Sequence, residues 1–468
     1  MSTRTKNRRF ALTRPICPQC VKLQEEIKRL REEKHRLEAQ LRSQQRKLDE
    51  GYFGSSTPSS KKPFKANTPA ERNNGGGRVG HRGYGRITLD AREADAVVVV
   101  DTEYVCPDCH VTLESLDLPD RTVTEVKPVQ VKKVLYQLTR RRWPECRRVF
   151  GAKAPGVLPK FKQSNSLLAH VAVEHFLHQV TLGHLAGRLG INESSLIAAM
   201  HHLASRFKAV PEKLIAEYRQ AAVKHADETI WPNDGRNGYA WIFVTRTITI
   251  FRLRLTRSAS VVREVLGEEP LLGALIVDRY SAYNKVLCLI QYCYAHLLRL
   301  VTDLGKEFPD HQEVHDFVNT AAPLLTQAIK LRTLPITDEV FYTRADQLKM
   351  DIQQAMHSQA RHAGIQKIQN IFRDNAHRLY HWAQDRSIPA DNNFAERELR
   401  QLVIARKISF GSQGDAGAKT RETLMTTLLT LKKRRPGDVW LHLKACLDEL
   451  ARDSTQDPYQ LLFAPNTS

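Results

Sequence analysis

The sequence predicts a multidomain protein built around an α/β core. At 468 residues the chain exceeds one compact core, because domains usually contain about 100–200 residues. Strand-like runs with helical segments between them begin at residue 221, and long helical patterns without strands occur on both sides of this region. Hydrophobic residues make up 41% of the chain, which is enough to bury a substantial core.

Residues 21–50 carry a heptad pattern of apolar side chains separated by Glu, Lys and Arg, with interruptions at Lys34 and Gln44. Such a pattern is typical of a coiled coil, so we expect a homo-oligomer formed through this segment. Because the pattern spans only about four heptads, a single solvent-exposed amphipathic helix is the alternative. The apolar positions are Leu23, Ile27, Leu30, Leu37, Leu41 and Leu48.

The formal net charge of +20 indicates a polyanionic partner, with nucleic acid as the first candidate and a merely basic soluble protein as the alternative. Residues 51–90 are rich in Gly, Ser, Pro and basic residues, which predicts a flexible cationic linker. No apolar run approaches the roughly 18 residues that span a bilayer, and no apolar segment typical of a secretory signal follows the basic start. We therefore expect a cytoplasmic, nucleoid-associated protein without a membrane partner.

Two of the cysteine pairs have Cys-x-x-Cys spacing, which in a non-secreted chain favours metal binding over disulfides. The second pair, in "CPDC" (106–109), lies among short strand-like runs and is followed by "WPEC" (143–146), which predicts a zinc-ribbon-like region. Trp143 stands where a third cysteine is expected. Either the remaining thiolates, with His110 beside them, hold Zn²⁺, or Trp143 packs into the vacated ligand space. The candidate zinc ligands are Cys106, Cys109 and Cys146.

Basic side chains are concentrated between Lys132 and Lys162, where ten Lys and Arg residues accompany a single acid, Glu145. This density indicates contact with phosphates. The candidate DNA-binding residues of this region are Arg140, Arg141, Arg142, Arg147 and Arg148.

Residues 166–208 predict helices. The segment "TLGHLAGRLGINESSLIAAMHHL" has a turn at Gly190 and an Asn/Ser-capped second helix, the pattern of a helix-turn-helix. An ordinary helical hairpin is the alternative, because "NESS" offers few side chains that read bases.

Beyond residue 221 the pattern predicts three consecutive strands, a helix, a strand, a helix, a strand and a helix. The third strand alternates. Ile248, Ile250, Arg252 and Arg254 are predicted on one face, and Phe251, Leu253 and Leu255 on the other. The fourth is an unbroken apolar run, so we expect it to be covered on both faces. The predicted strands occupy residues 222–231, 239–246, 247–255, 271–278 and a run that starts at 286.

Two acids are placed on these strands in a way that packing alone does not explain. Asp227 lies on the first strand, and Asp278 ends the apolar fourth strand. If the two strands are neighbours, their carboxylates meet at one edge of the sheet, where they repel each other unless cations are bound. Oxygen ligands suit Mg²⁺ or Mn²⁺, and two such ions about 3.5–4 Å apart support phosphoryl transfer.

The segment "IPADNNFAERELRQLVIARK" (388–407) predicts a helix capped by Asp391 or Asn392, with a third carboxylate, Glu396, just over one turn in. Glu398 competes with Glu396, but two positions along a helix turn a side chain by about 200°, so both cannot face one site. The candidate DNA-binding cations of this helix are Arg397, Arg400, Arg406 and Lys407.

With these residues in place, the chain resembles transposases of the insertion-sequence family 66 group. The resemblance covers roughly residues 65–468 and depends on four motifs in register. These are "HADET" (225–229), "VDRYSAYN" (277–284), "CYAHLLR" (293–299) and "DNNFAERELR" with the following "ARKISFGSQGDAGA" (391–418).

The resemblance implies an RNase H-like core, with Asp227, Asp278 and Glu396 as catalytic residues and ligands of two Mg²⁺ or Mn²⁺ ions. It also implies DNA cleavage at the ends of an insertion sequence and strand transfer into target DNA. Cys293 and His296 match a Cys-x-x-His motif, to which we assign only a local structural role. One alternative is a catalytically inactive DNA-binding relic or repressor of the same family, and another is a nuclease that cuts without joining.

The expected organisation combines these segments into eight parts. They are a cysteine knuckle plus coiled coil (1–50), a basic linker (51–90), the zinc-ribbon-like region (91–160), a helix-turn-helix-like region (161–212), the first part of the RNase H-like core (213–304), a helical insertion (305–387), the glutamate helix of the core (388–412) and C-terminal helices (413–468).

Overall fold

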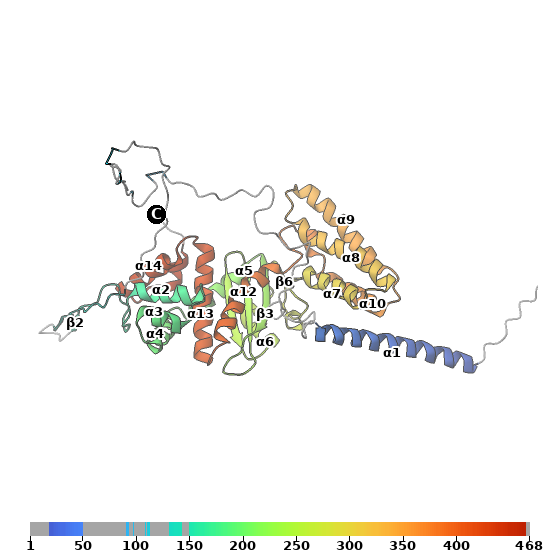
Figure 1. Ribbon diagram of the computed structural model, residues 1–468, viewed down its shortest axis with the longest axis horizontal. Helices are drawn as coiled ribbons and strands as arrows, with labels where there is room; N and C mark the ends of the chain where they lie inside the picture. Colours follow the sequence, from blue (N-terminus) through green and yellow to red (C-terminus); the bar gives the residue numbers. More distant parts are fainter. Residues whose placement is uncertain are drawn as a thin grey trace, which may run out of the picture. The chain divides into compact units, whose positions relative to one another are not determined.

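The computed structural model describes residues 18–49, 90–92, 97, 108, 110–112, 131–142 and 149–464 (Figure 1). Contacts between Cα atoms divide the chain into two compact units, residues 64–135 and the remainder. Within the described residues of 64–135 there is no helix or strand, so the elements below belong to the second unit.

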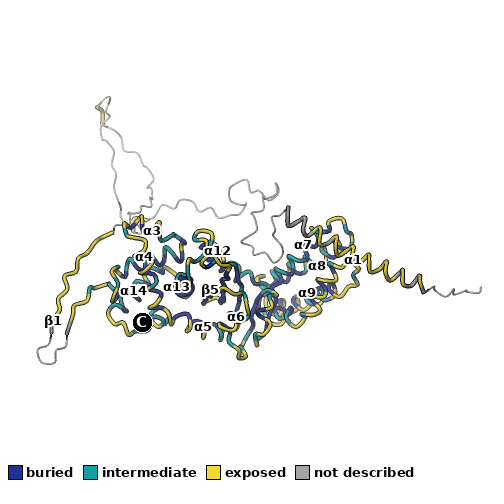
Figure 2. The backbone as a smooth tube through the Cα atoms, turned by 90° about the horizontal axis from the view of Figure 1, so that it is seen from below, coloured by how far each residue is buried: buried dark blue, intermediate teal, exposed yellow. Residues whose placement is uncertain are grey.

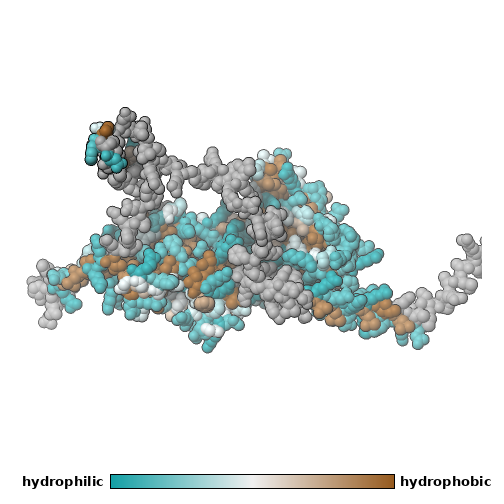
Figure 3. Space-filling model, in the orientation of Figure 1, coloured by the Kyte–Doolittle hydropathy of each residue, from teal (hydrophilic) through white to brown (hydrophobic). Residues whose placement is uncertain are grey.

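The N-terminal helix α1 (Pro18–Asp49) spans 32 residues. Ion pairs spaced three or four residues apart lie along it, for example Lys34 with Glu38 at 3.7 Å. Brown patches mark hydrophobic residues along this helix in Figure 3. The predicted helix is present, and its pairing with a second copy stays a prediction. Five apolar heptad side chains are 48–67% exposed in this single chain, namely Leu23, Ile27, Leu30, Leu37 and Leu41.

Two short antiparallel strands, β1 (Arg140–Arg142) and β2 (Val149–Gly151), carry part of the basic region. Arg141 pairs with Phe150 in their register. The candidate zinc ligands and Trp143 lie outside the described residues, as do Arg147 and Arg148, so the predicted zinc ribbon stays a prediction.

In the described chain, four helices lie between β2 and the main sheet. The predicted helix-turn-helix segment corresponds to the second and third of them. A left-handed Gly190 (φ 62°) ends the second helix, and the side chain of Asn192 accepts a hydrogen bond from the Ser194 N–H at 2.9 Å to start the third. The four are α2 (Asn165–Phe176), α3 (Leu182–Leu189), α4 (Glu193–Arg206) and α5 (Val210–Gln220).

The main sheet has five strands in the order β5-β4-β3-β6-β7. The first three strands in sequence form an antiparallel meander, and the last two run parallel to β3. All four residues of β6 are buried, as its apolar sequence predicted. The strands are β3 (Val223–Ile230), β4 (Tyr239–Val244), β5 (Thr249–Arg254), β6 (Ala274–Val277) and β7 (Leu289–Tyr292).

The connections within the sheet are close to those predicted, with one difference. Helix α6 (Ala259–Leu266) joins β5 to β6 as expected. The prediction of a helix between β6 and β7 was wrong, because a single 3₁₀ turn, η2 (Ser281–Tyr283), occupies that position. The link is short. Tyr283 is buried, and its ring packs against Trp241 of β4, which holds the turn against the sheet.

The edge strand β5 is covered by helix α13 (Asp415–Arg434). Unpaired N–H groups of an edge strand are a liability, and here side chains of α13 accept their hydrogen bonds. Alternate strand residues advance by about 6.7 Å and four helical residues by about 6 Å, so the two spacings match. The bonds are Thr249 N to Thr430 Oγ1 at 3.0 Å, Phe251 N to Thr426 Oγ1 at 3.0 Å and Leu253 N to a Glu422 carboxylate oxygen at 3.1 Å.

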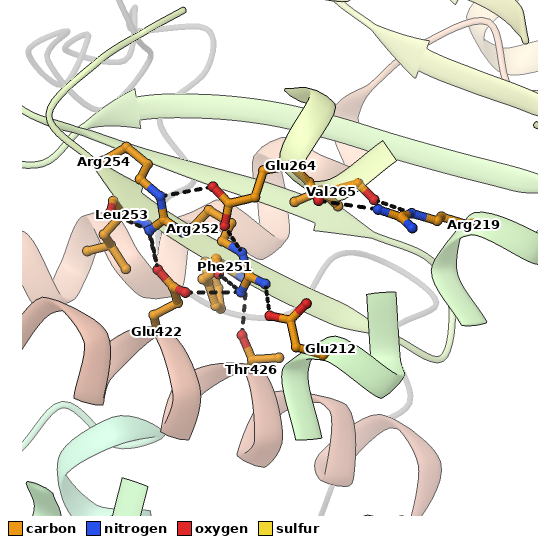
Figure 4. A network of polar contacts seen from close by, with 10 residues as sticks. All are labelled: Glu212, Arg219, Phe251, Arg252, Leu253, Arg254, Glu264, Val265, Glu422 and Thr426. Atoms are coloured by element: carbon orange, nitrogen blue, oxygen red, sulfur yellow. Dashed lines mark hydrogen bonds and ion pairs between the residues drawn. The ribbon is translucent and has the colours of Figure 1, made fainter. Parts of the chain in front are cut away.

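A network of buried charges joins the same edge to its neighbours (Figure 4). The guanidinium of Arg252, only 2% exposed, contacts carboxylates of Glu212 at 2.7 Å, Glu264 at 2.9 Å and Glu422 at 3.0 Å. Arg254 pairs with Glu422 at 2.7 Å and also with Glu264. Each buried charge therefore has an opposite charge beside it, and α5, α6 and α13 are tied to β5.

Between β7 and helix α12 (Asn393–Ser409) the described chain is helical. Helix α7 directly follows β7, and its N-terminal residues lie at the same end of the sheet as Asp278. The helices of this segment are α7 (Tyr294–Glu307), α8 (Gln312–Leu331), α9 (Asp338–His357), α10 (Ala363–Asp374) and α11 (His381–Gln384).

Two further helices, α14 (Val439–Arg452) and α15 (Pro458–Phe463), close the chain. Helix α13 is the most deeply buried long helix, and Figure 2 shows it and β5 as largely dark blue. In the part of the chain that the structure describes, no helix combines the length and the apolar character that crossing a membrane would require.

Candidate active site

The first two acids lie side by side on the neighbouring strands β3 and β6, at the end of the sheet where β6 stops, as the sequence predicted. Strand β3 pairs in parallel with β6, and His225 is opposite Ile276. Extending this register by two residues brings Asp227 level with Asp278, which directly follows β6. One oxygen of each carboxylate accepts a backbone N–H, from Glu228 at 2.9 Å and from Tyr280 at 2.8 Å respectively.

Helix α12 brings the third acid to the same place. Alternate residues of β3 face this helix, since His225 contacts Asn392 and Thr229 contacts Arg406. Asp227 lies between those two positions and therefore faces the helix as well. Burial raises the pKa of Asp227 well above its usual value, and the charges of Glu228, Asp278 and Glu396 raise it further. The three predicted acids thus act on one another electrostatically.

Glu398, the competitor of Glu396, has a different environment. Its carboxylate pairs with Lys433 of α13 at 2.9 Å and accepts a hydrogen bond from the Thr249 hydroxyl at 3.3 Å. The 200° rotation predicted from helix geometry accounts for this separation. Glu398 is therefore part of the contact between α12, α13 and β5.

A fourth acid, Glu228, lies next to the group and was not predicted. It points to the opposite side of β3 from Asp227, is 8% exposed, and accepts hydrogen bonds from Arg257 Nε at 3.0 Å and the Tyr283 hydroxyl at 2.9 Å. Burial raises its pKa, Asp278 acts in the same direction, and Arg257 opposes both. An acid directly after Asp227 on a buried strand was the signal that could have revealed it.

Asn392 connects the parts that carry the acids. It is fully buried, and its side chain contacts His225 Nδ1 at 2.9 Å and donates to the Ala226 carbonyl at 2.8 Å. Its backbone N–H donates to Cys293 Sγ at 3.1 Å. Asn392 therefore joins β3 to the starts of α7 and α12. Asn392 is the N-cap residue of α12, but its side chain makes no capping hydrogen bond, and the neighbouring Asp391 accepts the Asn393 N–H at 3.0 Å.

The two residues of the Cys-x-x-His motif have different surroundings. Cys293 belongs to the junction around Asn392, and His296 lies beside Glu396. Burial raises the pKa of Cys293 to about 12, so its thiol stays protonated and serves as a hydrogen-bonding group. His296 Nε2 lies 3.8 Å from a Glu396 oxygen, and its buried Nδ1 has no hydrogen-bond partner in the described structure. Burial lowers the pKa of His296, and the Glu396 charge opposes that shift.

The predicted DNA-binding cations of α12 fall into two groups. Arg397, Arg400 and Lys407 are exposed and form no ion pair with a described residue. Arg406 lies on the opposite side of the helix, where its guanidinium donates to the Thr229 hydroxyl at 3.1 Å and to the Ile230 carbonyl. Arg406 therefore anchors α12 to β3, and the other three face outward.

The chemistry of the acid group suits a hard divalent cation, because every candidate donor is a carboxylate oxygen. The raised pKa of Asp227 reflects negative charge that bound cations would neutralise. Among the described residues, no three His, Cys, Asp or Glu side chains are already close enough together to hold a metal ion. The ligand type fits, and binding would require the three carboxylates to move closer together.

One comparison with known proteins identifies the family of this chain. A family model described as Transposase IS66 family matches residues 160–420, which is more than half of the chain. The match includes the whole five-stranded sheet, the three acids and the helical segment between β7 and α12, and it identifies the chain as a transposase. The chain belongs to the IS66 family, so the resemblance drawn from its motifs is confirmed. A search of curated proteins found no match.

Proposed function

We propose that this transposase cleaves DNA at the ends of an insertion sequence and joins the freed ends to target DNA, with Asp227, Asp278 and Glu396 as its catalytic acids. The observation that carries the proposal is the grouping of these acids at the edge of β3 and β6, where Asp227 has a raised pKa and no described Lys or Arg forms an ion pair with any of the three. Uncompensated acids are costly in a purely structural role.

We assign the binding of Mg²⁺ or Mn²⁺, as two ions, to the same three carboxylates. When bound, these ions would stabilise charge on the attacking and leaving oxygens of a phosphodiester. The protein's own contribution is position. Asn392 joins β3 to the starts of α7 and α12, and His296 Nε2 lies 3.8 Å from a Glu396 oxygen.

Cationic surfaces would hold the DNA. Arg397, Arg400 and Lys407 are exposed along α12 and can contact phosphates close to the acids. We further propose that the basic strand β1, with Arg140, and the α3–α4 pair contact the terminal repeats, and that α1 joins copies of the chain as a coiled coil. The strand order β5-β4-β3-β6-β7 supports an RNase H-like core.

The test uses the full chain, DNA that carries the element's ends, and Mg²⁺. Wild-type protein should convert these ends into strand-transfer products, and Asp278→Asn should abolish the conversion. Asp310→Asn, which changes an exposed acid in a loop between α7 and α8, is the matched control and should retain activity. Undiminished strand transfer by Asp278→Asn would remove the proposed site.

The same assay separates the alternatives. A catalytically inactive DNA-binding relic or repressor would bind the DNA ends with a strong salt dependence and would not cleave DNA with any divalent metal ion present. A nuclease that does not join would produce cut ends that never appear in target DNA.

A further inference from the structure

Helix α12 presents a mixed cationic and apolar stripe to solvent. At 100° per residue, five exposed side chains fall within about 100° of one another around the helix. Three of them are cations, and the other two are Ile404 and Ile408, which are 45% and 41% exposed. The stripe starts one residue after Glu396 and consists of Arg397, Arg400, Ile404, Lys407 and Ile408.

Phe410 ends this stripe in an unusual conformation. It is 82% exposed, more than any other described Phe, Tyr or Trp, and its φ of 57° lies in the left-handed region. That region is unfavourable for a residue with a Cβ, and helices that end this way usually use Gly or Asn. Isolated exposed hydrophobic residues are common, but an exposed phenyl ring on strained backbone gains nothing within the chain itself.

The backbone around Phe410 is fixed from both sides. The Phe410 N–H donates to the Arg406 carbonyl at 2.7 Å. At Gly411, a Cβ would lie 2.1 Å from the Pro232 carbonyl oxygen, so only glycine permits this close approach. The Ser412 N–H donates to the same carbonyl at 3.0 Å, and its hydroxyl accepts from the Trp231 indole at 3.0 Å. The ring is therefore held out from the surface by a braced loop.

We propose that Phe410 is a DNA-stacking side chain, which inserts against a base while the cations of α12 hold the neighbouring phosphates. An aromatic or apolar side chain among cations is how proteins unstack or capture bases. Glu396 and Phe410 are 14 residues apart, or about 21 Å along a helix axis, which corresponds to roughly six base pairs of duplex. The proposal rests on the proposed function, because it assumes that DNA lies along α12.

The partner of this stripe is DNA and not a second copy of the chain. A second copy would have to desolvate or pair three adjacent cations. Phosphates neutralise such cations directly, and Arg397, Arg400 and Lys407 form no ion pair with a described residue. The two isoleucines provide apolar surface for sugar and base edges between the phosphate contacts.

The test measures DNA binding by the full chain in a chelator, so that it does not depend on catalysis. The probes are a 30-base-pair duplex and the same duplex with a one-nucleotide gap, which costs less to unstack. Phe410→Gly removes the ring and the backbone strain together, so folding should be retained. We expect it to lose about tenfold in affinity for the gapped duplex and to keep the salt dependence of the wild type.

Two further variants make the result specific. Phe410→Trp should show indole fluorescence quenched by the gapped duplex beyond the wild-type change, whereas Leu272→Trp, at the exposed residue two before β6, should not. Arg400→Ala should weaken binding to both probes and lower the slope of log affinity against log salt by about one.

Unchanged affinity in Phe410→Gly together with no quenching in Phe410→Trp would overturn the proposal. A change of oligomeric state in Phe410→Gly without a change in DNA affinity would also overturn it, in favour of an interface between copies. If strand transfer by the wild type is observed and these Phe410 effects are absent, the proposed function stands and only the stacking role fails. If the wild type binds neither probe, both fail.

Discussion

Two regions of the sheet collect charged side chains, and they do so in opposite ways. At the β5 edge, Arg252 and Arg254 are interleaved with three glutamates, so that each buried charge has an opposite charge within hydrogen-bonding distance (Figure 4). Where β6 ends beside β3, Asp227 and Asp278 face helix α12, which carries Glu396. Among the described basic side chains, only the His296 imidazole lies within 4 Å of one of these three acids.

The difference separates charges that are paired within the fold from the acids that we propose bind metal ions. Buried ions in a compensated network recover part of their desolvation cost from their partners. The acids of the second region have no such compensation, and the raised pKa of Asp227 shows the cost. Breaking the first region should therefore reduce stability, and breaking the second should reduce activity while leaving or improving stability.

The sharpest form of the comparison uses two glutamates of the same helix. Glu396→Gln removes an acid of the uncompensated group, and we expect metal-dependent strand transfer to fall on the order of a thousandfold with no loss of stability. Glu398→Gln breaks the pair with Lys433, which should cost about 2 kcal/mol of unfolding free energy and leave strand transfer measurable. Strand-transfer assays and urea denaturation of both variants provide the measurements. Equal loss of activity in the two variants would contradict the assignment.

The compensated network gives the next largest effect. Arg252→Met leaves the Glu422 carboxylate, which is 8% exposed, without one of its two arginines. Removing one partner of a buried pair destabilises by about 3–5 kcal/mol, so the urea midpoint should fall markedly. The double variant Arg252→Met with Glu422→Met should be less destabilised than the single one, because no buried carboxylate loses its partner: Glu264 keeps Arg254, and the Glu212 side chain is 70% exposed. A double variant that is worse than the single would show that the network contributes net stability.

The positions of the acids could be predicted because each depends on the pattern of the residues directly around it. An apolar run that ends on Asp278 and a strand that carries Asp227 are visible in the residue order, and helical phase separates Glu396 from Glu398. The strands of the sheet were predicted with small errors at their ends for the same reason.

The charge partners could not be predicted, because they come from distant parts of the chain. Arg252 lies on one face of an alternating strand, and its burial is caused by α5 and α13, the latter about 170 residues away. Similarly, Asn392 appeared to be a helix cap, whereas its side chain reaches β3 across 167 residues. Alternation gives the face of a strand on which a side chain lies, and the packing of other elements determines what it meets there.

The smallest effect concerns the pH dependence of stability in the uncompensated region. The pKa of Asp227 is raised in the folded protein, so the folded state binds its proton more tightly than the unfolded state. Folding therefore loses stability as the pH rises above the unfolded pKa of about 3.9. Asp227→Asn removes this loss. With a chelator present at pH 7, its free energy of unfolding should exceed that of the wild type by about 1 kcal/mol.

Near pH 3 the two proteins should be equally stable, because Asp227 is then protonated in both the folded and the unfolded state. Thermal unfolding between pH 3 and pH 8 gives the comparison, with Asp310→Asn as the control for an exposed acid. Mg²⁺ should then raise the melting temperature of the wild type more than that of Asp227→Asn, because an ion that binds only the folded state stabilises it. A variant less stable than the wild type at pH 7 would mean that Asp227 is compensated after all, and the contrast with the β5 edge would disappear.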